Sequence, residues 1–175
     1  MIVNGSRLLK AAPIEGMFDS KHKFNGTSHG LAEAGYDIRI NQDVHFYPAT
    51  WWRSAYIIMD HDSSLSDSGD TTSRYKGTAC LASAIEKFQM PQDLVGVVHD
   101  KSTWARKFLS VQNTVVEPGW HGYLTLEFNF YGSEEVHIQR GQGIAQVLFS
   151  RLEEDGDYGD GKYQGQANRP VAAKS

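Results

Sequence analysis

The sequence contains a single cysteine, Cys80, among 175 residues. One cysteine excludes a framework of intrachain disulfide bonds, which small secreted domains commonly need for stability. The first residues also lack the basic segment, the apolar core and the small-residue cleavage site of a secretory signal peptide. Both absences favour a protein of the reducing cytosol, so we expect a cytoplasmic location.

Long apolar stretches and a surplus of basic residues are missing as well. No run of 18 apolar residues occurs, so the sequence predicts no membrane span. The 17 Lys and Arg residues face 21 Asp and Glu residues, which gives a formal net charge of −4. A protein that coats nucleic acid would instead present a basic face. We therefore expect neither a membrane nor a nucleic-acid partner.

Helical periodicity is scarce, whereas glycine and short β-prone segments are common. The 17 glycines and the many short segments predict one all-β domain, a jelly-roll-like barrel with a sizeable core. A short amphipathic helix is expected over residues 2–12, anchored by Ile2, Leu8 and Leu9, and a helical turn over residues 103–108. Strands are expected at residues 35–40, 44–47, 56–59, 94–98, 123–130 and 136–139.

Two polar segments are expected to be loops, namely residues 16–29 and the Ser-, Asp- and Thr-rich residues 60–77. Asp37 and Arg39 have a structural interpretation as an ion pair on one strand. The aromatic pair of Trp51 and Trp52 is expected to pack in a core or in an interface.

The stretch from His99 to Asn129 carries the most chemistry. Residues 100–103 place a cation and two hydroxyl groups directly after an apolar run. Such a junction can present backbone N–H groups, hydroxyls and a lysine charge to a phosphate. Arg106 follows Ser102 by four residues, so the two side chains would share one face of a helical turn. The alternative is a polar cap on a short helix.

The strand expected over residues 123–130 alternates strictly, with Leu124, Leu126, Phe128 and Phe130 on one face. Glu127 therefore lies on the polar face. This carboxylate is either a solvated surface group or a group in a cavity, where desolvation would raise its pKa and suit it to proton transfer. Just before the strand, Pro118 and Gly119 predict a turn that presents Trp120 beside Glu117.

The stretch resembles the dCTP deaminase branch of the trimeric dUTPase-like superfamily. That family carries [RK]-S-[ST]-x-A-R, then I-D-P-G-[WF]-x-G, then a strand with L-x-x-E. Three segments of this sequence resemble these motifs in order, at residues 101–106, 116–122 and 124–127. The resemblance implies a β-clip barrel that assembles as a homotrimer, and it favours a strand over residues 78–88, whose Ala and Glu content alone would also allow a helix.

Further matches lie outside that stretch. Residues 35–39 resemble the family's [GS]-[YV]-D-[LI]-R motif, and residues 141–147 resemble its G-x-x-I-A-Q-[LV] element. In the family the glutamine of this element approaches the phosphates; a buried amide bonded to backbone is the alternative for Gln146. Residues 162–166 read K-Y-Q-G-Q, the family's C-terminal lid motif. We expect a barrel domain over residues 1–152 and a flexible lid over 153–175, with a disordered terminus as the alternative.

The implied reaction is the hydrolytic deamination of dCTP to dUTP and ammonia. Zinc-dependent nucleobase deaminases need an H-x-E and a P-C-x-x-C pair, and one cysteine cannot supply the second. A side chain must then activate the water. The resemblance assigns this role to Glu127, with Ser102 and Arg106 of a neighbouring subunit fixing the water and the carboxylate.

The resemblance also implies the substrate-binding residues. Mg²⁺ would arrive on the triphosphate rather than in a protein cage, and dTTP would be a feedback inhibitor. Glu117 and Trp120 would face the deoxyribose; a turn and a core tryptophan are the alternative for these two residues. The residues expected on the triphosphate are Lys101, Ser102, Thr103, Gln146, Tyr158, Lys162 and Gln166. The remaining candidates from the matched motifs are Trp104, Ala105, Asn113, Thr125 and Leu126.

Departures from the family leave alternatives open. The loop between Arg106 and Glu127 is shorter than in the family, and a reshaped base pocket near Asn113 would suit a 5-substituted cytosine. Glu117 replaces the usual aspartate, which in dUTPases positions the hydrolytic water. A dUTP diphosphatase, a bifunctional enzyme that forms dUMP and diphosphate, and a non-catalytic nucleotide-binding regulator are the alternatives. Glu127 and the K-Y-Q-G-Q tail favour the deaminase.

Overall fold

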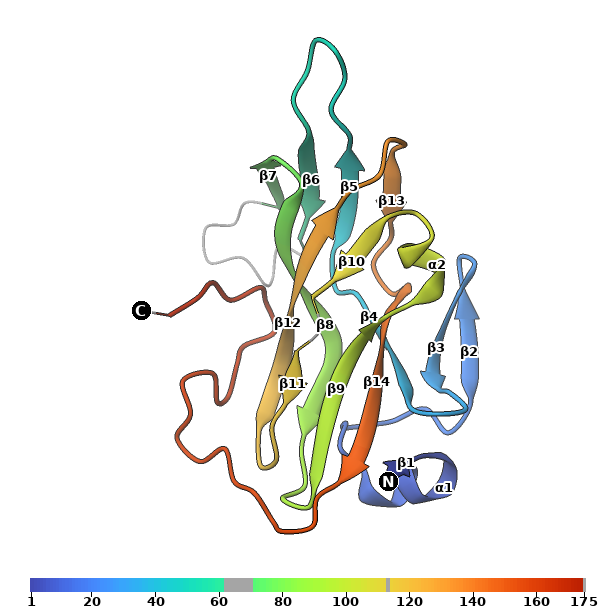
Figure 1. The fold of residues 1–175 in the computed structure, drawn as a ribbon, viewed down its shortest axis with the longest axis vertical. Helices are drawn as coiled ribbons and strands as arrows, with labels where there is room; N and C mark the ends of the chain where they lie inside the picture. Colours follow the sequence, from blue (N-terminus) through green and yellow to red (C-terminus); the bar gives the residue numbers. More distant parts are fainter. Residues whose placement is uncertain (62–70, 113, 175) are drawn as a thin grey trace.

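The computed structural model describes residues 1–61, 71–112 and 114–174. The described residues form an all-β fold with two short helices, as the sequence predicts (Figure 1). The helices are α1 (Gly5–Ala11) and α2 (Ser102–Ala105). The strands are β1 (Ile2–Val3), β2 (Lys21–Phe24), β3 (Thr27–Leu31), β4 (Tyr36–Arg39), β5 (Asp43–Tyr47), β6 (Tyr56–Asp60), β7 (Thr72–Lys76), β8 (Ala79–Gln89), β9 (Leu94–Asp100), β10 (Leu109–Val111), β11 (Val115–Val116), β12 (His121–Phe130), β13 (Val136–Ile138) and β14 (Gly143–Arg151).

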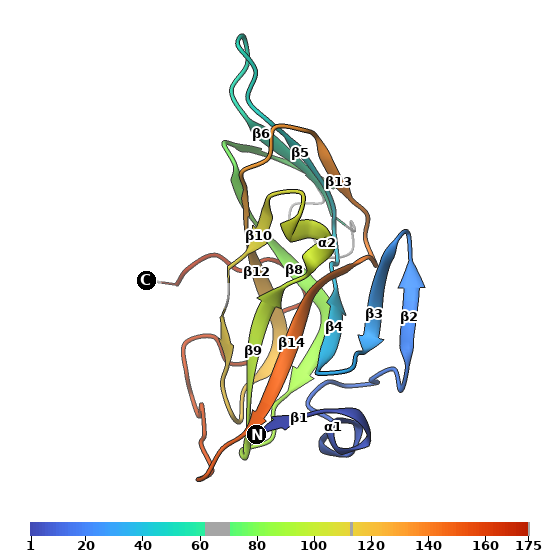
Figure 2. The ribbon, with the colours of Figure 1, turned by 45° about the vertical axis from the view of Figure 1, so that its right-hand side comes forward.

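These strands form three sheets, and every strand pairing within them is antiparallel. The seven-stranded sheet has the order β11-β9-β14-β4-β3-β2, with β1 added beside β14. The three-stranded sheet is β10-β12-β8, and the four-stranded sheet is β13-β5-β6-β7. Figures 1 and 2 show the β5–β6 hairpin projecting beyond the rest of the chain. Neither described helix has the length and apolar character needed to cross a lipid bilayer.

The core lies between the sheets and takes one face of each strand. On β12, Leu126, Phe128 and Phe130 are buried while Glu127 and Asn129 are only partly buried, which confirms the predicted alternation from residue 126 onward. The alternation is interrupted before that point, where the register shifts between Tyr123 and Thr125 and Thr125 is buried as well. Phe46 of β5 packs on this apolar face, with its ring centroid 5.3 Å from that of Phe130. Burial of each such side chain contributes roughly 1.5–3 kcal/mol. Strand β12 is therefore held rigidly behind its partly buried face.

The segment over residues 16–29, predicted as a loop, is largely a β-hairpin of β2 and β3. Its turn is Asn25–Gly26, where both residues have positive φ angles, 44° and 81°. A two-residue turn of this kind matches the twist of the strands that it joins, and Asn-Gly is its preferred sequence. The turn signal was present, but all four residues of β2 are exposed, so no apolar alternation accompanied it.

Three other predictions are wrong in part. Residues 2 and 3 form β1 before the helix, and Val3 is buried whereas Ile2 is 50% exposed, because pairing with β14 rather than a helix sets their direction. Within the segment predicted as a surface loop over residues 60–77, Thr72–Lys76 forms β7 beside β6; residues 62–70 lie outside the described part. Trp51 and Trp52 are 91% and 67% exposed, so neither packs in the core of the chain.

The expected ion pair between Asp37 and Arg39 is also wrong, because each residue has another partner. The Arg39 Nε donates to Glu86 of β8 at 2.8 Å, and the Lys101 ammonium donates to Asp37. Asp37 and Glu86 are 2% and 5% exposed. A buried carboxylate needs a hydrogen-bonded cation, and the neighbouring strands supply one for each.

Candidate active site

A cavity of about 350 Å³ lies beside β12, between the end of β11 and the C-terminal segment. Four parts of the chain build it: β11 with the turn that follows, one face of β12, Leu81 of β8, and the segment over residues 153–174, here called the tail. Figure 1 shows the tail running alongside β12. The lining residues are Leu81, Thr114, Val115, Val116, Glu117, Trp120, Leu124, Thr125, Glu127, Tyr158, Tyr163, Gln166, Val171 and Ala173.

Glu127 of β12 is a carboxylate that lines this cavity. It faces Leu81 across the β12–β8 ladder and is partly buried. Desolvation by burial raises the pKa of the Glu127 carboxyl above its usual value, and a hydrogen bond from its own backbone N–H acts in the opposite direction. A carboxylate with a raised pKa is a stronger proton acceptor than a solvated one, which suits a general base.

The turn between β11 and β12 is fixed by Gly119 and Trp120. Gly119 has a φ angle of 74°, which L side chains rarely adopt, and the Trp120 N–H donates to the Glu117 carbonyl at 3.2 Å. The Trp120 indole N–H donates to the carbonyl of Tyr163 in the tail at 2.8 Å. Trp120 is buried while Glu117 is exposed at the cavity rim. The turn thus places an exposed acid and a buried aromatic side by side in the cavity lining.

Backbone hydrogen bonds hold the tail against the barrel. The Gly165 N–H donates to the His121 carbonyl at 3.0 Å. Further along, the Val171 N–H donates to the Thr125 hydroxyl at 3.0 Å, so Thr125 is bonded to the tail two residues from Glu127 along the strand. Val171 and Ala173 line the same cavity as Glu127. A mobile lid in these residues remains a prediction.

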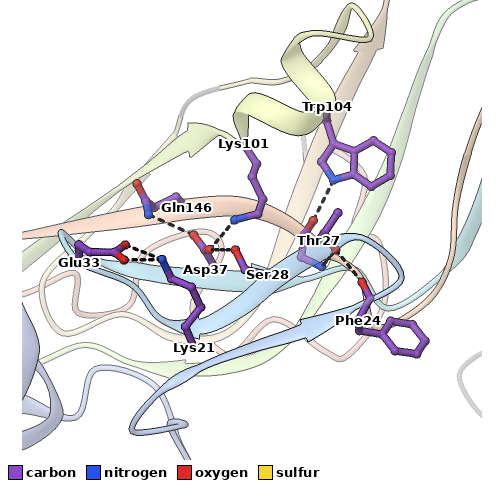
Figure 3. A network of polar contacts seen from close by, with 10 residues as sticks. Lys21, Phe24, Thr27, Ser28, Glu33, Asp37, Lys101, Trp104 and Gln146 are labelled. Atoms are coloured by element: carbon purple, nitrogen blue, oxygen red, sulfur yellow. Dashed lines mark hydrogen bonds and ion pairs between the residues drawn. The ribbon is translucent and has the colours of Figure 1, made fainter.

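A second polar cluster lies at the junction of β9 and α2, on the seven-stranded sheet (Figure 3). Lys101, Gln146 and Ser28 all donate to the carboxylate of Asp37. Two residues that the sequence assigns to the triphosphate, Lys101 and Gln146, thus share one acceptor. Neither lines the cavity that contains Glu127.

The structure brings together six of the predicted site residues. They are Glu127 and five further residues that line the same cavity: Glu117, Trp120, Thr125, Tyr158 and Gln166. The other predicted residues lie elsewhere in the described chain: Lys101, Ser102, Thr103, Trp104, Ala105, Arg106, Leu126, Gln146 and Lys162. Asn113 lies outside the described residues.

The residues that lie elsewhere differ in their surroundings. Ser102, Thr103, Ala105 and Arg106 are exposed on or next to α2. The Trp104 side chain is buried, and its indole N–H donates to the Gly143 carbonyl at 2.8 Å. Leu126 is buried in the core on the opposite face of β12 from Thr125, and Lys162 is exposed.

Eight lining residues were not among the predicted site residues, namely Leu81, Thr114, Val115, Val116, Leu124, Tyr163, Val171 and Ala173. Tyr163 lies inside the K-Y-Q-G-Q motif, so the motif was a signal for it. Leu81 follows from the register once Glu127 is placed, because the two are directly opposite. Val171 and Ala173 have no sequence signal of this kind.

Gly122 allows the tail to approach β12 closely. It has a φ angle of 134°, and a Cβ atom at this position would lie 2.6 Å from the Gln166 nitrogen. We predict that Gly122→Ala displaces the tail and raises KM for the substrate, while Glu127 stays in place. Limited proteolysis should cut the variant earlier in the tail than the parent protein, and steady-state kinetics should show the rise in KM.

Gly77→Ala is the matched control. Gly77 also has a positive φ angle, 91°, but nothing lies within 4 Å of the added Cβ atom. This variant has the backbone strain without the contact, so its tail should be cut like that of the parent. Equal protease sensitivity of all three proteins would contradict the role of Gly122.

Comparisons with known proteins identify the family of the chain. The dCTP deaminase-like family model matches residues 10–152. The chain is 32% identical over 171 residues to a dCTP deaminase from Anaplasma phagocytophilum (strain HZ), covering 93% of this chain and 90% of that protein. It is 34% identical over 155 residues to a dCTP deaminase from Francisella tularensis subsp. novicida (strain U112), covering 79% and 77%.

The fold has a counterpart among solved structures. The crystal structure of 2′-deoxycytidine 5′-triphosphate deaminase from Agrobacterium tumefaciens superposes with a TM-score of 0.54 at 13% sequence identity, over 86% of this chain and 48% of that one. This similarity concerns the fold, whereas the family model and the sequence identities above concern descent. The chain therefore belongs to the dCTP deaminase-like family.

Proposed function

We propose that this protein is a dCTP deaminase that converts dCTP and water to dUTP and ammonia, with Glu127 as the general base. The observation that supports this most directly is the position of Glu127, a partly buried carboxylate with a raised pKa in a cavity whose walls are largely apolar. Membership of the dCTP deaminase-like family supports the choice of substrate.

The proposed reaction proceeds by addition of water and loss of ammonia. Glu127 takes a proton from a bound water, and the hydroxide forms a bond to C4 of the cytosine ring. The ring nitrogen N3 receives the proton through Glu127. A proton from the added hydroxyl group then moves to the amino group, the C–N bond breaks, ammonia leaves, and the C4 carbonyl of dUTP remains.

We propose that a second copy of the chain completes the site. Ser102 and Arg106 are both exposed, and neither lines the cavity around Glu127 within the described part of the chain. In a homotrimer, the α2 region of one subunit would reach the cavity of its neighbour. Arg106 would then stabilise the ionised form of Glu127, and Ser102 would hold the water.

The remaining groups fit the other parts of the nucleotide. Glu117 at the rim would accept a hydrogen bond from the 3′-hydroxyl, and Trp120 would pack against the deoxyribose. Tyr158 and Gln166, with Lys162 after a movement of the tail, would contact the triphosphate. No three His, Cys, Asp or Glu side chains among the described residues are arranged to hold a metal, so Mg²⁺ would arrive bound to phosphate oxygens.

The experiment measures ammonia release from dCTP with phosphate products assayed in parallel. Ammonia without diphosphate is the expected result. Diphosphate released from dUTP would indicate the bifunctional or diphosphatase alternative. Tight dCTP binding with neither product would indicate a regulator and contradict the proposal. Titration with dTTP in the same assay tests the proposed feedback inhibition, and 5-methyl-dCTP as a second substrate tests the wider base pocket.

The pH dependence of the rate should reflect the raised pKa of Glu127. The base acts only when ionised, so kcat/KM should fall as the pH is lowered through this pKa. Desolvation moves this limb above about 4.3, the value of an unperturbed glutamate, and Arg106 of a neighbouring subunit would move it back towards lower pH. A pH–rate profile measures this limb.

Glu117→Gln provides the control for the pH profile. Glu117 is exposed at the cavity rim rather than at the position of the base, so this substitution should leave the acid limb where it is. A rate that stays constant down to pH 4 in the parent protein would exclude a titrating base in the site.

A further inference from the structure

Asp37 is a buried carboxylate on which three donors from three different strands or junctions converge (Figure 3). The Ser28 hydroxyl donates at 2.8 Å, the Gln146 amide donates at 3.1 Å, and the Lys101 ammonium donates to the same group. The residue is 2% exposed and lies on β4, between β14 and β3. It is therefore a fixed anion inside the seven-stranded sheet.

The two larger donors reach Asp37 from different parts of the chain. Lys101 directly precedes Ser102 at the start of α2, and its side chain is only 12% exposed. Gln146 is the register partner of Asp37 across the β14–β4 ladder. A single carboxylate thus fixes the direction of both side chains.

Asp37 does not use up the hydrogen-bonding capacity of its partners. An ammonium group has three donors and a side-chain amide has two donors and an acceptor, so each retains groups for a second partner. The buried carboxylate also offsets the cost of removing the Lys101 charge from water. Lys101 and Gln146 are thereby oriented before an anion arrives, which lowers the entropy lost on binding.

The position of α2 depends on a second anchor that does not involve Asp37. The Trp104 indole N–H donates to the Gly143 carbonyl, and the Gly143 N–H donates to the Thr27 hydroxyl at 2.9 Å. These bonds attach α2 to β14 and β3 on their own. Loss of the Asp37 charge should therefore loosen two side chains and leave the backbone of α2 in place.

We propose that Asp37 is a positioning residue for triphosphate binding, which acts by holding Lys101 and Gln146 in the orientation that meets the phosphates. The proposal rests on the proposed function, and on the family resemblance of the sequence, which implies that both side chains contact the triphosphate. It assigns Asp37 no contact with the reacting base. The loss of kcat/KM on substitution of Asp37 should therefore be larger for a nucleoside triphosphate than for a monophosphate.

The test compares Asp37→Asn with the parent protein on dCTP and on dCMP. Asparagine keeps the shape but removes the charge that binds Lys101. We expect kcat/KM for dCTP to fall by about tenfold, mainly through KM, which is the size of one charge-assisted hydrogen bond. The value for dCMP should change by less than about twofold, since dCMP carries one phosphate in place of the triphosphate that the proposal assigns to Lys101 and Gln146. Equal losses on both nucleotides, or no loss on either, would overturn the proposal.

Glu33→Gln is the matched control. Glu33 is an exposed carboxylate that pairs with Lys21 at 2.5 Å, and Figure 3 shows the pair close to Asp37. Loss of an exposed ion pair costs little, so this variant should match the parent on both nucleotides. A similar dCTP-specific loss in Glu33→Gln would mean that any negative charge in this region has the effect, and would overturn the assignment to Asp37.

A double-mutant cycle with Lys101→Met separates this proposal from the proposed function. If Asp37 acts through Lys101, the substitution of Asp37 should have a smaller effect on dCTP binding in the Lys101→Met protein than in the parent. Full additivity would overturn the proposal. Calorimetric binding of dCTP and dCMP gives the same comparison between parent and Asp37→Asn without turnover. If the parent protein binds dCTP but releases no ammonia, the proposed function is refuted. The binding data then still show whether Asp37 acts on the triphosphate.

Discussion

Glu127→Gln should lower the rate of ammonia release from dCTP by about 10²–10⁴-fold, the usual contribution of a general base. Glutamine has nearly the shape of the carboxylate but cannot accept a proton from water. The cavity walls and the tail contacts do not depend on the charge, so KM or the dissociation constant for dCTP should change little. Single-turnover kinetics and equilibrium binding measure the two quantities separately.

The stability of this variant provides the control. Burial raises the pKa of Glu127, so its ionised form disfavours the folded state at neutral pH. The stabilising contribution of protonated Glu127 is complete below the pKa that this residue has in the unfolded chain. It is lost as the pH rises through the higher pKa that Glu127 has in the folded protein. Glu127→Gln should therefore unfold at the same temperature as the parent at pH 7, or at a higher one. An inactive variant with a lower unfolding temperature would point to misfolding instead of a missing base.

Subunits of Glu127→Gln and Arg106→Ala should regain activity when they are assembled together. Each variant alone lacks one half of every site. In a mixed trimer, a site is intact where an Arg106→Ala subunit supplies Glu127 and a neighbouring Glu127→Gln subunit supplies Arg106. About a quarter of the sites in a random mixture meet this condition. Ammonia release by co-expressed, doubly tagged and purified protein measures the restored fraction.

The control mixture combines Glu127→Gln with Glu127→Ala subunits. Both have the same defect, so no arrangement yields an intact site. If the first mixture is as inactive as this one while mass measurements show mixed oligomers, Arg106 and Glu127 do not meet across subunits. That result would contradict the shared site and leave the chemistry of Glu127 to be tested by the single variant.

The elements that the sequence predicted correctly are those with a strong local pattern. Strand β12 was predicted because its apolar residues alternate, and that alternation also placed Glu127 on the face that lines the cavity. The β2–β3 hairpin was missed because β2 is exposed on both faces and has no alternation to detect. Its Asn25–Gly26 turn was the stronger signal.

The candidate site was harder to predict because its parts meet through long-range contacts. The bond from the Val171 N–H to the Thr125 hydroxyl joins the tail to β12 through backbone chemistry that no residue pattern records. The sequence placed Ser102 and Arg106 with Glu127 by motif order alone, and motif order gives no distance. In a single chain these residues lie apart, as expected if a neighbouring subunit supplies them.

The sole thiol of the chain makes the tail accessible to spectroscopy. Burial raises the pKa of Cys80 to about 12, so this group stays protonated and shielded at neutral pH and reacts poorly with thiol-directed dyes. Ala172 is exposed and differs from cysteine by one sulfur atom. A fluorophore attached at Ala172→Cys would therefore label one position without removal of the native cysteine, and its emission would report nucleotide entry in real time.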